Sequence, residues 1–309
     1  MKIVVYGAGA VGAFFGGMLA RNGQSVEFVA RGAHLDALQK RGILIESTLL
    51  GQVQVPPVHA APTAAHLHKA DLMLVCVKAH HTGAILSDLA EAVRDTTVIV
   101  PLQNGVESDE VLAARFGRNR VATAVVYVGA TLEAPGVVSH VAPGAIILGA
   151  RLGFDPARLP AVRNVLATSG QQITISHDIL HERWHKLIWN AGFNTVSAIA
   201  NMTPAQILAM PPLRELVIGI MREVVAVANA QGIMLREGDI REQIAWTDGA
   251  TGIRTSMMID RATGRSMEVD AIIGVVVRKG RELGVPTPLS SALSALLQAA
   301  DATRKGGRE

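Results

Sequence analysis

The apolar positions in the first half of the chain form short runs that alternate with longer segments of helical period. The short runs predict strands at 3–6, 26–30, 72–77 and 97–100. The segments between them predict helices at 10–21, 33–40, 82–93 and 106–115. Later strands are expected at 121–129, 136–140, 145–148 and 171–176, and one further helix at 156–169. This alternation is typical of a parallel sheet with helices on both faces.

Beyond residue 176, helical period dominates to the end of the chain. The expected helices cover 178–200, 204–210, 212–231, 236–245, 255–261, 267–283 and 289–302. Pro204, Pro211, Pro212, Pro286 and Pro288 separate them and stand mostly at helix starts. We therefore predict an α/β domain over 1–170 and an all-α domain over 171–309, with a short disordered tail at 304–309. A ligand site is expected in the cleft between the two domains.

A glycine-rich turn directly follows the first predicted strand. Its glycines have the G-x-G-x-x-G spacing, and the motif is Gly7-Ala8-Gly9-Ala10-Val11-Gly12. In such a turn the first glycine permits the bend, the second lets a pyrophosphate approach the backbone, and the third lets the helix pack against the sheet. The helix N-terminus adds free N–H groups and a partial positive charge. The turn predicts a dinucleotide site; the alternative is an ordinary glycine-rich turn.

The end of the second strand indicates which dinucleotide is bound. An NAD site places an acidic residue there for the ribose hydroxyls, about 20 residues beyond the last glycine. At this offset the chain has Arg31, whereas Glu27 lies inside the strand and points elsewhere. A guanidinium matches a 2′-phosphate in charge and geometry. We therefore predict NADPH rather than NADH, against the alternative of a solvated surface arginine.

Segment 181–201 reads HERWHKLIWNAGFNTVSAIAN and carries the strongest further signal. As a helix, it places Lys186, Asn190 and Asn194 on one face because they recur every four residues. The other positions are mostly apolar, so these groups interrupt a buried helix, where an unpartnered polar group is costly. Lys186 is a candidate general acid for an oxygen that gains negative charge. The alternative is a polar stripe exposed to solvent.

Four further residues are candidates by position alone. Asn104 and Lys78 follow apolar strands whose carboxyl ends should face a ligand, although Asn104 also suits a turn and Lys78 a solvated strand end. Ser256 and Glu268 open predicted helices, where capping and the helix dipole also explain them.

Composition limits the classes of protein to which the chain can belong. The 309 residues are 49% hydrophobic, with a net charge of +3, one cysteine and no long basic run. These values argue against disulfides and against nucleic acid as the main partner, and they fit a reducing cytoplasm. We expect no membrane span, no cleaved leader and no metal site, since His80 and His81 are adjacent and no acidic cluster stands beside them.

Taken together, these segments resemble the ketopantoate reductase (2-dehydropantoate 2-reductase) family along nearly the whole chain. The matching pieces are GAGAVG at 7–12, Arg31, Lys78, QNG at 103–105, HKLIWNAGFN at 185–194, TSMMID at 255–260, EVD at 268–270 and GVPTP at 284–288. The resemblance implies a Rossmann-like domain followed by an all-α domain. It also implies NADPH-dependent reduction of 2-dehydropantoate, or a related branched 2-keto acid, to the hydroxy acid in pantothenate biosynthesis.

The resemblance also implies roles for individual residues. Lys186 would be the catalytic acid and Glu268 its supporting carboxylate, which also lies near the cofactor. Asn190, Asn194 and Ser256 would bind substrate, while Lys78 and Asn104 would lie near cofactor and substrate. The chain departs from the family pattern at 79–81, where Ala-His-His follows Lys78. This departure puts the identity of the keto acid in doubt more than the reaction.

Two other functions stay open at this stage. A β-hydroxyacid dehydrogenase would also carry Lys186 and Asn190 at this spacing, and an NADPH-binding sensor would bind cofactor without turnover. Asn194, Ser256 and Glu268 favour the reductase over the dehydrogenase, and the presence of both Lys186 and Glu268 argues against the sensor. The apolar segment Ala271–Val277 fits either the core or a subunit contact, so a homodimer is compatible with the sequence but not established by it.

Overall fold

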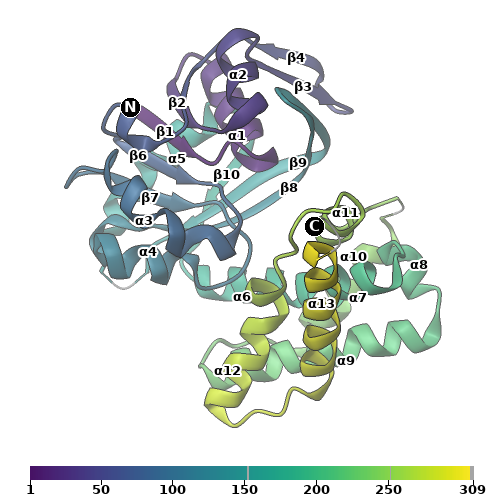
Figure 1. Ribbon diagram of the computed structural model, residues 1–309. Helices are drawn as coiled ribbons and strands as arrows, with labels where there is room; N and C mark the ends of the chain where they lie inside the picture. The colour runs from purple at the N-terminus through teal and green to yellow at the C-terminus, as the bar shows by residue number, and fades with distance from the viewer. Residues whose placement is uncertain (152, 251, 307–309) are drawn as a thin grey trace. The chain divides into compact units, whose positions relative to one another are not determined.

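The computed structural model describes residues 1–151, 153–250 and 252–306, and the chain forms two compact units (Figure 1). The first unit is Met1–Ile179 and the second begins at Leu180. The boundary lies later than the predicted residue 170, because strand β10 (Gln172–Ile175) pairs with β9 (Val137–Gly149) of the first unit. Helix α13 (Pro288–Gly306) enters the segment expected to be disordered, and residues 307–309 lie outside the described part.

The first unit contains the predicted parallel sheet. Its strands stand in the order β5-β2-β1-β6-β7, with bounds His59–Ala61, Ser25–Val29, Lys2–Tyr6, Leu72–Val75 and Val98–Pro101. The helices of this half are α1 (Ala10–Arg21), α2 (Gly32–Lys40), α3 (Thr82–Ala90) and α4 (Ser108–Phe116). Alternate residues of β1 enter two different hydrophobic clusters, Ile3 and Val5 in one and Val4 and Tyr6 in the other. Both faces of the sheet are therefore covered, as predicted for parallel strands.

A second sheet lies in the same unit and differs from the prediction. It joins β3 (Ile43–Ser47), β4 (Gly51–Val55) and β8 (Thr123–Ala134) to β9 and β10. The two strands expected at 136–140 and 145–148 are one strand, β9, and β3, β4 and β5 were not predicted. A turn at Pro135 and Gly136 connects β8 to β9. Helix α1 packs against this sheet, where the Phe14 ring stacks on His140 at 4.2 Å between ring centroids.

Short helical segments complete the first unit. Four of them are 3₁₀ turns, η1 (Ala64–His66), η2 (Ala79–His81), η3 (Arg118–Arg120) and η4 (Pro156–Arg158). The helix predicted at 156–169 consists of η4 followed by α5 (Leu159–Ala167).

Every regular element of the second unit is a helix, as far as the structure describes its residues. Its elements are α6 (Ile179–Trp189), η5 (Asn190–Asn194), α7 (Thr195–Ala200), α8 (Pro204–Leu208), α9 (Pro211–Ala230), α10 (Glu237–Asp248), α11 (Ser256–Ala262), η6 (Asp270–Gly274), α12 (Val275–Leu283) and α13. Glu223 of α9 accepts hydrogen bonds from the N–H groups of Leu289 and Ser290, both 2.8 Å long, and thereby caps α13. An α/β domain followed by an all-α domain confirms the predicted fold class.

The apolar segment Ala271–Val277 belongs to the core of the second unit. Ile272, Ile273, Val275 and Val276 are at most 1% exposed within a single chain. Their burial therefore needs no subunit contact, and the homodimer stays a prediction. No helix in the described ranges is long and apolar enough to cross a membrane.

Candidate active site

The glycine turn has the geometry that its spacing predicts. Gly7 adopts a left-handed φ of 99°, and a Cβ placed on it would lie 2.7 Å from Val77 Cγ1. A Cβ on Gly12 would overlap the Gly7 carbonyl oxygen and lie 3.0 Å from Cys76 Cβ. A Cβ on Gly9, by contrast, would meet nothing within 4 Å. The first and third glycines are thus required by packing, whereas the second leaves open space beside the backbone.

The N-terminus of α1 offers its N–H groups toward this space. The N–H groups of Gly7 and Ala8 donate to the Val29 carbonyl at 3.2 and 3.1 Å, which ties the turn to β2. Gly9 is the N-cap residue of α1 and makes no side-chain hydrogen bond to it, and the first turn carries no acidic residue. Open space next to a helix N-terminus without a side-chain cap fits the pyrophosphate of a dinucleotide.

Alanine substitutions at Gly9 and Gly12 should therefore have opposite effects. Gly12→Ala should destabilise the fold by about 1–3 kcal/mol, because its methyl group has no room. Gly9→Ala should leave the melting temperature unchanged, because its φ of −68° suits alanine and its surroundings are open, but it should weaken NADPH binding. Thermal melts and NADPH titration by fluorescence measure both effects. Full NADPH affinity in Gly9→Ala would exclude this turn as the phosphate site.

Arg31 lies at the carboxyl edge of the sheet, as the cofactor prediction requires. It is exposed, forms the N-cap of α2, and follows β2, whose Val29 pairs with Tyr6 of β1. Burial and a hydrogen bond to Asp88 (2.5 Å) raise the pKa of Tyr6, while the nearby Arg31 charge lowers it. The charge of Arg31 is therefore close enough to act on Tyr6, the last residue of β1.

Gln103, which the sequence analysis left without a role, joins the loops after β6 and β7. Its Nε2 donates to the Val77 carbonyl at 2.8 Å and to Thr82 Oγ1 at 2.9 Å. Its Oε1 is buried and has no hydrogen-bond partner among the described residues. The signal available in the sequence was a glutamine that follows an apolar strand. An acceptor left unsatisfied at a strand end is a ready partner for a bound ligand.

Lys78 and Asn104 occupy the two loops that Gln103 joins. Lys78 lies in the loop after β6 rather than at the strand end as predicted, because β6 stops at Val75. Asn104 follows β7 and precedes Gly105, whose φ of 88° marks a turn. Because β6 and β7 are parallel neighbours, both residues stand at the same edge of the sheet, where open α/β sheets bind ligands.

In the second unit, Lys186, Asn190 and Asn194 lie on one continuous helical segment with an unpredicted wide turn. Residues 190–194 form the π-helix η5 between α6 and α7. In an α-helix a step of four residues overshoots a full turn, whereas in a π-helix it falls short. The two deviations have opposite signs, so the wide turn keeps Asn194 on the face that carries Lys186. Such turns are frequent at functional sites.

Lys186 has an electrostatic environment suited to proton donation. Burial lowers its pKa to about 8, the charge of Glu268 raises it, and the charge of Arg183 lowers it further. Arg183 is 4% exposed and lies one turn before Lys186 on α6. The side chain of Lys186 retains some exposed surface. An amine with a pKa near 8 holds a proton at neutral pH and releases it readily.

Two buried side-chain oxygens follow Lys186 along the same helix and have no hydrogen-bond partner within the described ranges. Asn190 and Asn194 are 6% and 2% exposed, and Asn194 Oδ1 accepts no hydrogen bond from the residues that the structure describes. Ser197 Oγ, one turn further, is equally buried and equally unpartnered within the described chain. Sequence reasoning missed Ser197, because a serine in an apolar helix is unremarkable. Buried groups of this kind need a partner to offset their desolvation.

Ser256 and Glu268 also lie in the second unit. The N-cap of α11 is Thr255, whose Oγ1 accepts from Met258 N–H at 3.2 Å, so Ser256 is exposed and is not the capping residue. Glu268 is 8% exposed and its carbonyl accepts from Ile272 N–H at the start of the helix that contains η6. Its carboxylate is close enough to act on the charge of Lys186.

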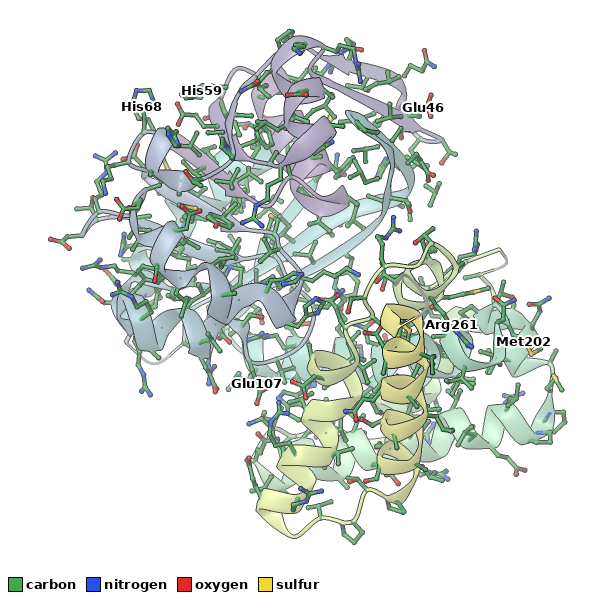
Figure 2. The ribbon with its side chains drawn as sticks, in the orientation of Figure 1. Glu46, His59, His68, Glu107, Met202 and Arg261 are labelled. Carbon is green, nitrogen blue, oxygen red and sulfur yellow. The ribbon has the colours of Figure 1, made fainter. Side chains whose placement is uncertain are left out.

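Asn201 and Arg261 close the end of this helix. Asn201 adopts a left-handed φ of 54° and ends α7 as a C-cap. Arg261, labelled in Figure 2, donates to the carbonyls of Ala198 and Ile199. These contacts fix the last turn of α7. The C-cap position explains the presence of Asn201 without a contact to substrate.

A dinucleotide-binding sheet joined to a helical unit with a lysine–glutamate pair defines a class of oxidoreductases. Two family models match this chain: "Ketopantoate reductase PanE/ApbA" over residues 3–153 and "Ketopantoate reductase PanE/ApbA C terminal" over residues 178–301. The chain belongs to the ketopantoate reductase family.

Individual relatives agree with this assignment. A 2-dehydropantoate 2-reductase of Mesorhizobium japonicum is 32% identical over 96% of this chain and 97% of its own. The crystal structure of 2-dehydropantoate 2-reductase from Geobacter metallireducens has a TM-score of 0.92 at 33% identity, covering 97% of this chain and 100% of that one. D-mandelate dehydrogenase, solved with NADH and anilino(oxo)acetate, shares the fold with a TM-score of 0.91 at 24% identity, covering 99% and 100% of the two chains.

Proposed function

We propose that this protein reduces 2-dehydropantoate, or a closely related branched 2-keto acid, to the 2-hydroxy acid with NADPH. The product would be pantoate, which serves pantothenate biosynthesis. The observation that carries the proposal is the Lys186 amine within reach of the Glu268 charge, on a helix whose buried Asn194 and Ser197 oxygens have no hydrogen-bond partner among the described residues. Membership in the family and the names of its relatives support the same reaction.

The cofactor would be held by residues of the first unit. The N-terminus of α1 and the space beside Gly9 suit its pyrophosphate, and Arg31 suits a 2′-phosphate. Lys78, Asn104 and Gln103 stand at the sheet edge where the nicotinamide half would lie. When bound, NADPH supplies a hydride to the carbonyl carbon of the substrate.

The helical unit would bind the keto acid and supply the proton. Lys186 would stabilise the negative charge that develops on the substrate oxygen and transfer its proton to that oxygen. Glu268 would hold the ammonium in its charged form before transfer. Asn190, Asn194 and Ser256 would hydrogen-bond the carboxylate or hydroxyl groups of the substrate, with Asn194 Oδ1 accepting from a hydroxyl. The amine would regain its proton from water.

The reaction rate should fall at alkaline pH. Lys186 acts only when protonated, and its pKa is about 8, so kcat should be level below pH 8 and fall about tenfold per unit above it. Glu268→Gln removes a charge that raises this pKa, so the falling limb should move to lower pH. Steady-state rates of the wild type and of Glu268→Gln between pH 6 and 10 locate the falling limb of each pH profile. A wild-type rate that stays level to pH 10 would contradict the assignment of Lys186.

A substrate panel distinguishes this proposal from the two other functions. NADPH oxidation should be fastest with branched 2-oxo acids, ketopantoate among them, and slower with straight or aromatic ones. Reduction of NADP⁺ by 3-hydroxy acids, without activity on 2-oxo acids, would indicate a β-hydroxyacid dehydrogenase. NADPH binding without turnover of any compound would indicate a sensor.

A further inference from the structure

A cluster of three side chains on the first unit has no role in the proposed reaction. It consists of Glu27 in β2, His59 at the start of β5 and His68 between η1 and β6. Glu27 Oε1 lies 2.5 Å from His68 Nδ1 and 3.0 Å from His59 Nδ1, and the three potential ligand atoms all lie within 4.8 Å of one another. Figure 2 shows His59 and His68 next to each other at the edge of this unit. Glu27 thus pairs with both histidines.

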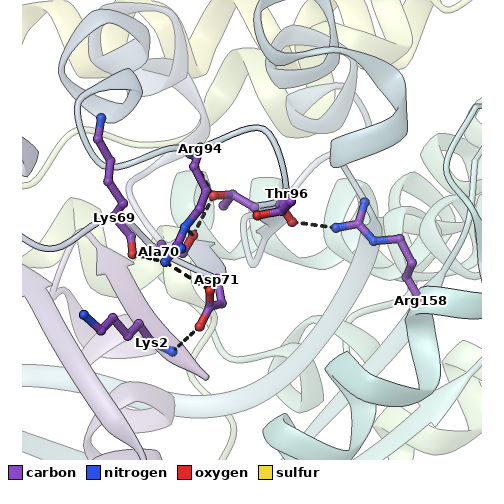
Figure 3. A network of polar contacts seen from close by, with 8 residues as sticks. Lys2, Lys69, Ala70, Asp71, Arg94, Thr96 and Arg158 are labelled. Carbon is purple, nitrogen blue, oxygen red and sulfur yellow. Dashed lines mark hydrogen bonds and ion pairs between the residues drawn. The ribbon is translucent and has the colours of Figure 1, made fainter.

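The backbone holds the three residues in place. Glu27 and His59 are directly paired in the parallel register of β2 and β5, and Glu27 Oε2 accepts from the His68 N–H at 2.8 Å. The residues after His68 are also held in place, because Arg94 donates hydrogen bonds to the carbonyls of Lys69 and Ala70 (Figure 3). The cluster is therefore preorganised by strand pairing and by a polar network, not by the side chains alone.

The donor set has the composition of a transition-metal site. Two imidazole nitrogens and one carboxylate oxygen are ligands of Zn²⁺ and its first-row neighbours, whereas Mg²⁺ and Ca²⁺ prefer oxygen alone. The carboxylate side chain is 13% exposed and the imidazoles 54% and 65%, so the anion lies at the base and the nitrogens at the open rim. An ion can enter from solvent and complete its shell with water.

We propose that Glu27, His59 and His68 bind one divalent first-row transition-metal ion of the Zn²⁺ type. Two strands and the segment leading into β6 contribute one ligand each, so the ion joins three separate parts of the first unit. Its effect is stabilisation of this unit, because an ion that binds only the folded chain shifts the folding equilibrium. The ion takes no part in catalysis, since Glu27 lies inside β2 rather than at the sheet edge that carries Arg31.

Calorimetric titration of the chelator-treated full chain with ZnCl₂ tests this site. One ion should bind per chain, and added Zn²⁺ should raise the melting temperature. His59→Ala and His68→Ala should each weaken Zn²⁺ binding by at least the ~10–100-fold that changes outside the ligand shell cost. NADPH oxidation should be unchanged in both variants, and this result would show that they fold. The metal site does not depend on the proposed function, so the two can fail separately.

Control variants test whether Zn²⁺ binds at other histidines of the chain. His66→Ala removes an exposed histidine of the neighbouring turn η1, whose Nδ1 lies 2.8 Å from Thr63 Oγ1, and should bind Zn²⁺ like the wild type. A double variant at His80 and His81, whose Nε2 atoms lie 3.2 Å apart, and His185→Ala, beside Asp239 and Glu242, should also bind normally. Absence of Zn²⁺ binding by the wild type would overturn the proposal. Loss of binding in these controls rather than in His59→Ala and His68→Ala would do the same.

Discussion

Replacing Lys186 with alanine should lower kcat for keto-acid reduction by about 10²–10⁴-fold, the usual contribution of a positioned general acid. The variant loses both the proton and the charge that stabilises the developing alkoxide. NADPH binding should survive, because the residues proposed to hold the cofactor belong to the first unit. Single-turnover rates and NADPH titration separate the two effects.

Two further variants define what Lys186 contributes. Lys279→Ala removes another lysine of the helical unit, on α12, and should retain nearly wild-type turnover. Lys186→Arg keeps a positive charge but not a pKa near 8, so it should recover little activity and lose the falling limb of the pH profile. A loss of less than about threefold in Lys186→Ala would end the general-acid assignment.

Replacing Arg31 with alanine should reduce kcat/KM for NADPH by about 10- to 100-fold. A charge-assisted hydrogen bond to phosphate contributes about 1.5–3 kcal/mol, and each 1.4 kcal/mol is tenfold. NADH lacks the 2′-phosphate, so kcat/KM for NADH should not fall. The ratio of kcat/KM for NADPH to kcat/KM for NADH should therefore decrease. Steady-state kinetics with both cofactors measure this ratio.

A matched arginine controls for a general loss of positive charge. Arg21 is exposed at the end of α1, and Arg21→Ala should preserve the NADPH preference. An unchanged preference in Arg31→Ala would remove Arg31 from the cofactor site, and equal effects of the two substitutions would point to long-range steering instead.

Local patterns predicted much of the fold. The bounds of α1 match the prediction because the glycine turn fixes its start and short-range periodicity fixes its length. Strands β3 and β4 of the second sheet were missed. β3 pairs with β9, about 90 positions further along the chain, and the alternating run of β4 is only five residues long. Strand β9 was divided in two because Pro143 and Gly144 interrupt the apolar pattern inside a continuous strand.

The candidate site was predictable where function depends on spacing. Lys186 and the asparagines recur on one helix face, and the glycines have fixed offsets, so both stand out in the sequence. The π-helix η5 was not predictable, since the same residues suit an α-helix and tertiary packing decides the wider turn. Gln103, Ser197 and the Glu27 cluster depend on contacts or burial that only folding creates. Their residue types alone are compatible with ordinary surface or core positions.

Isotope transfer tests the central claim most directly. NADPH carrying deuterium at both positions of C4 is incubated with ketopantoate, and the product is analysed by mass spectrometry. We expect one deuterium at C2 of pantoate, formed rapidly by the wild type and about 10²–10⁴-fold more slowly by Lys186→Ala. Pantoate without the label, or no product while NADPH remains bound, would contradict the account.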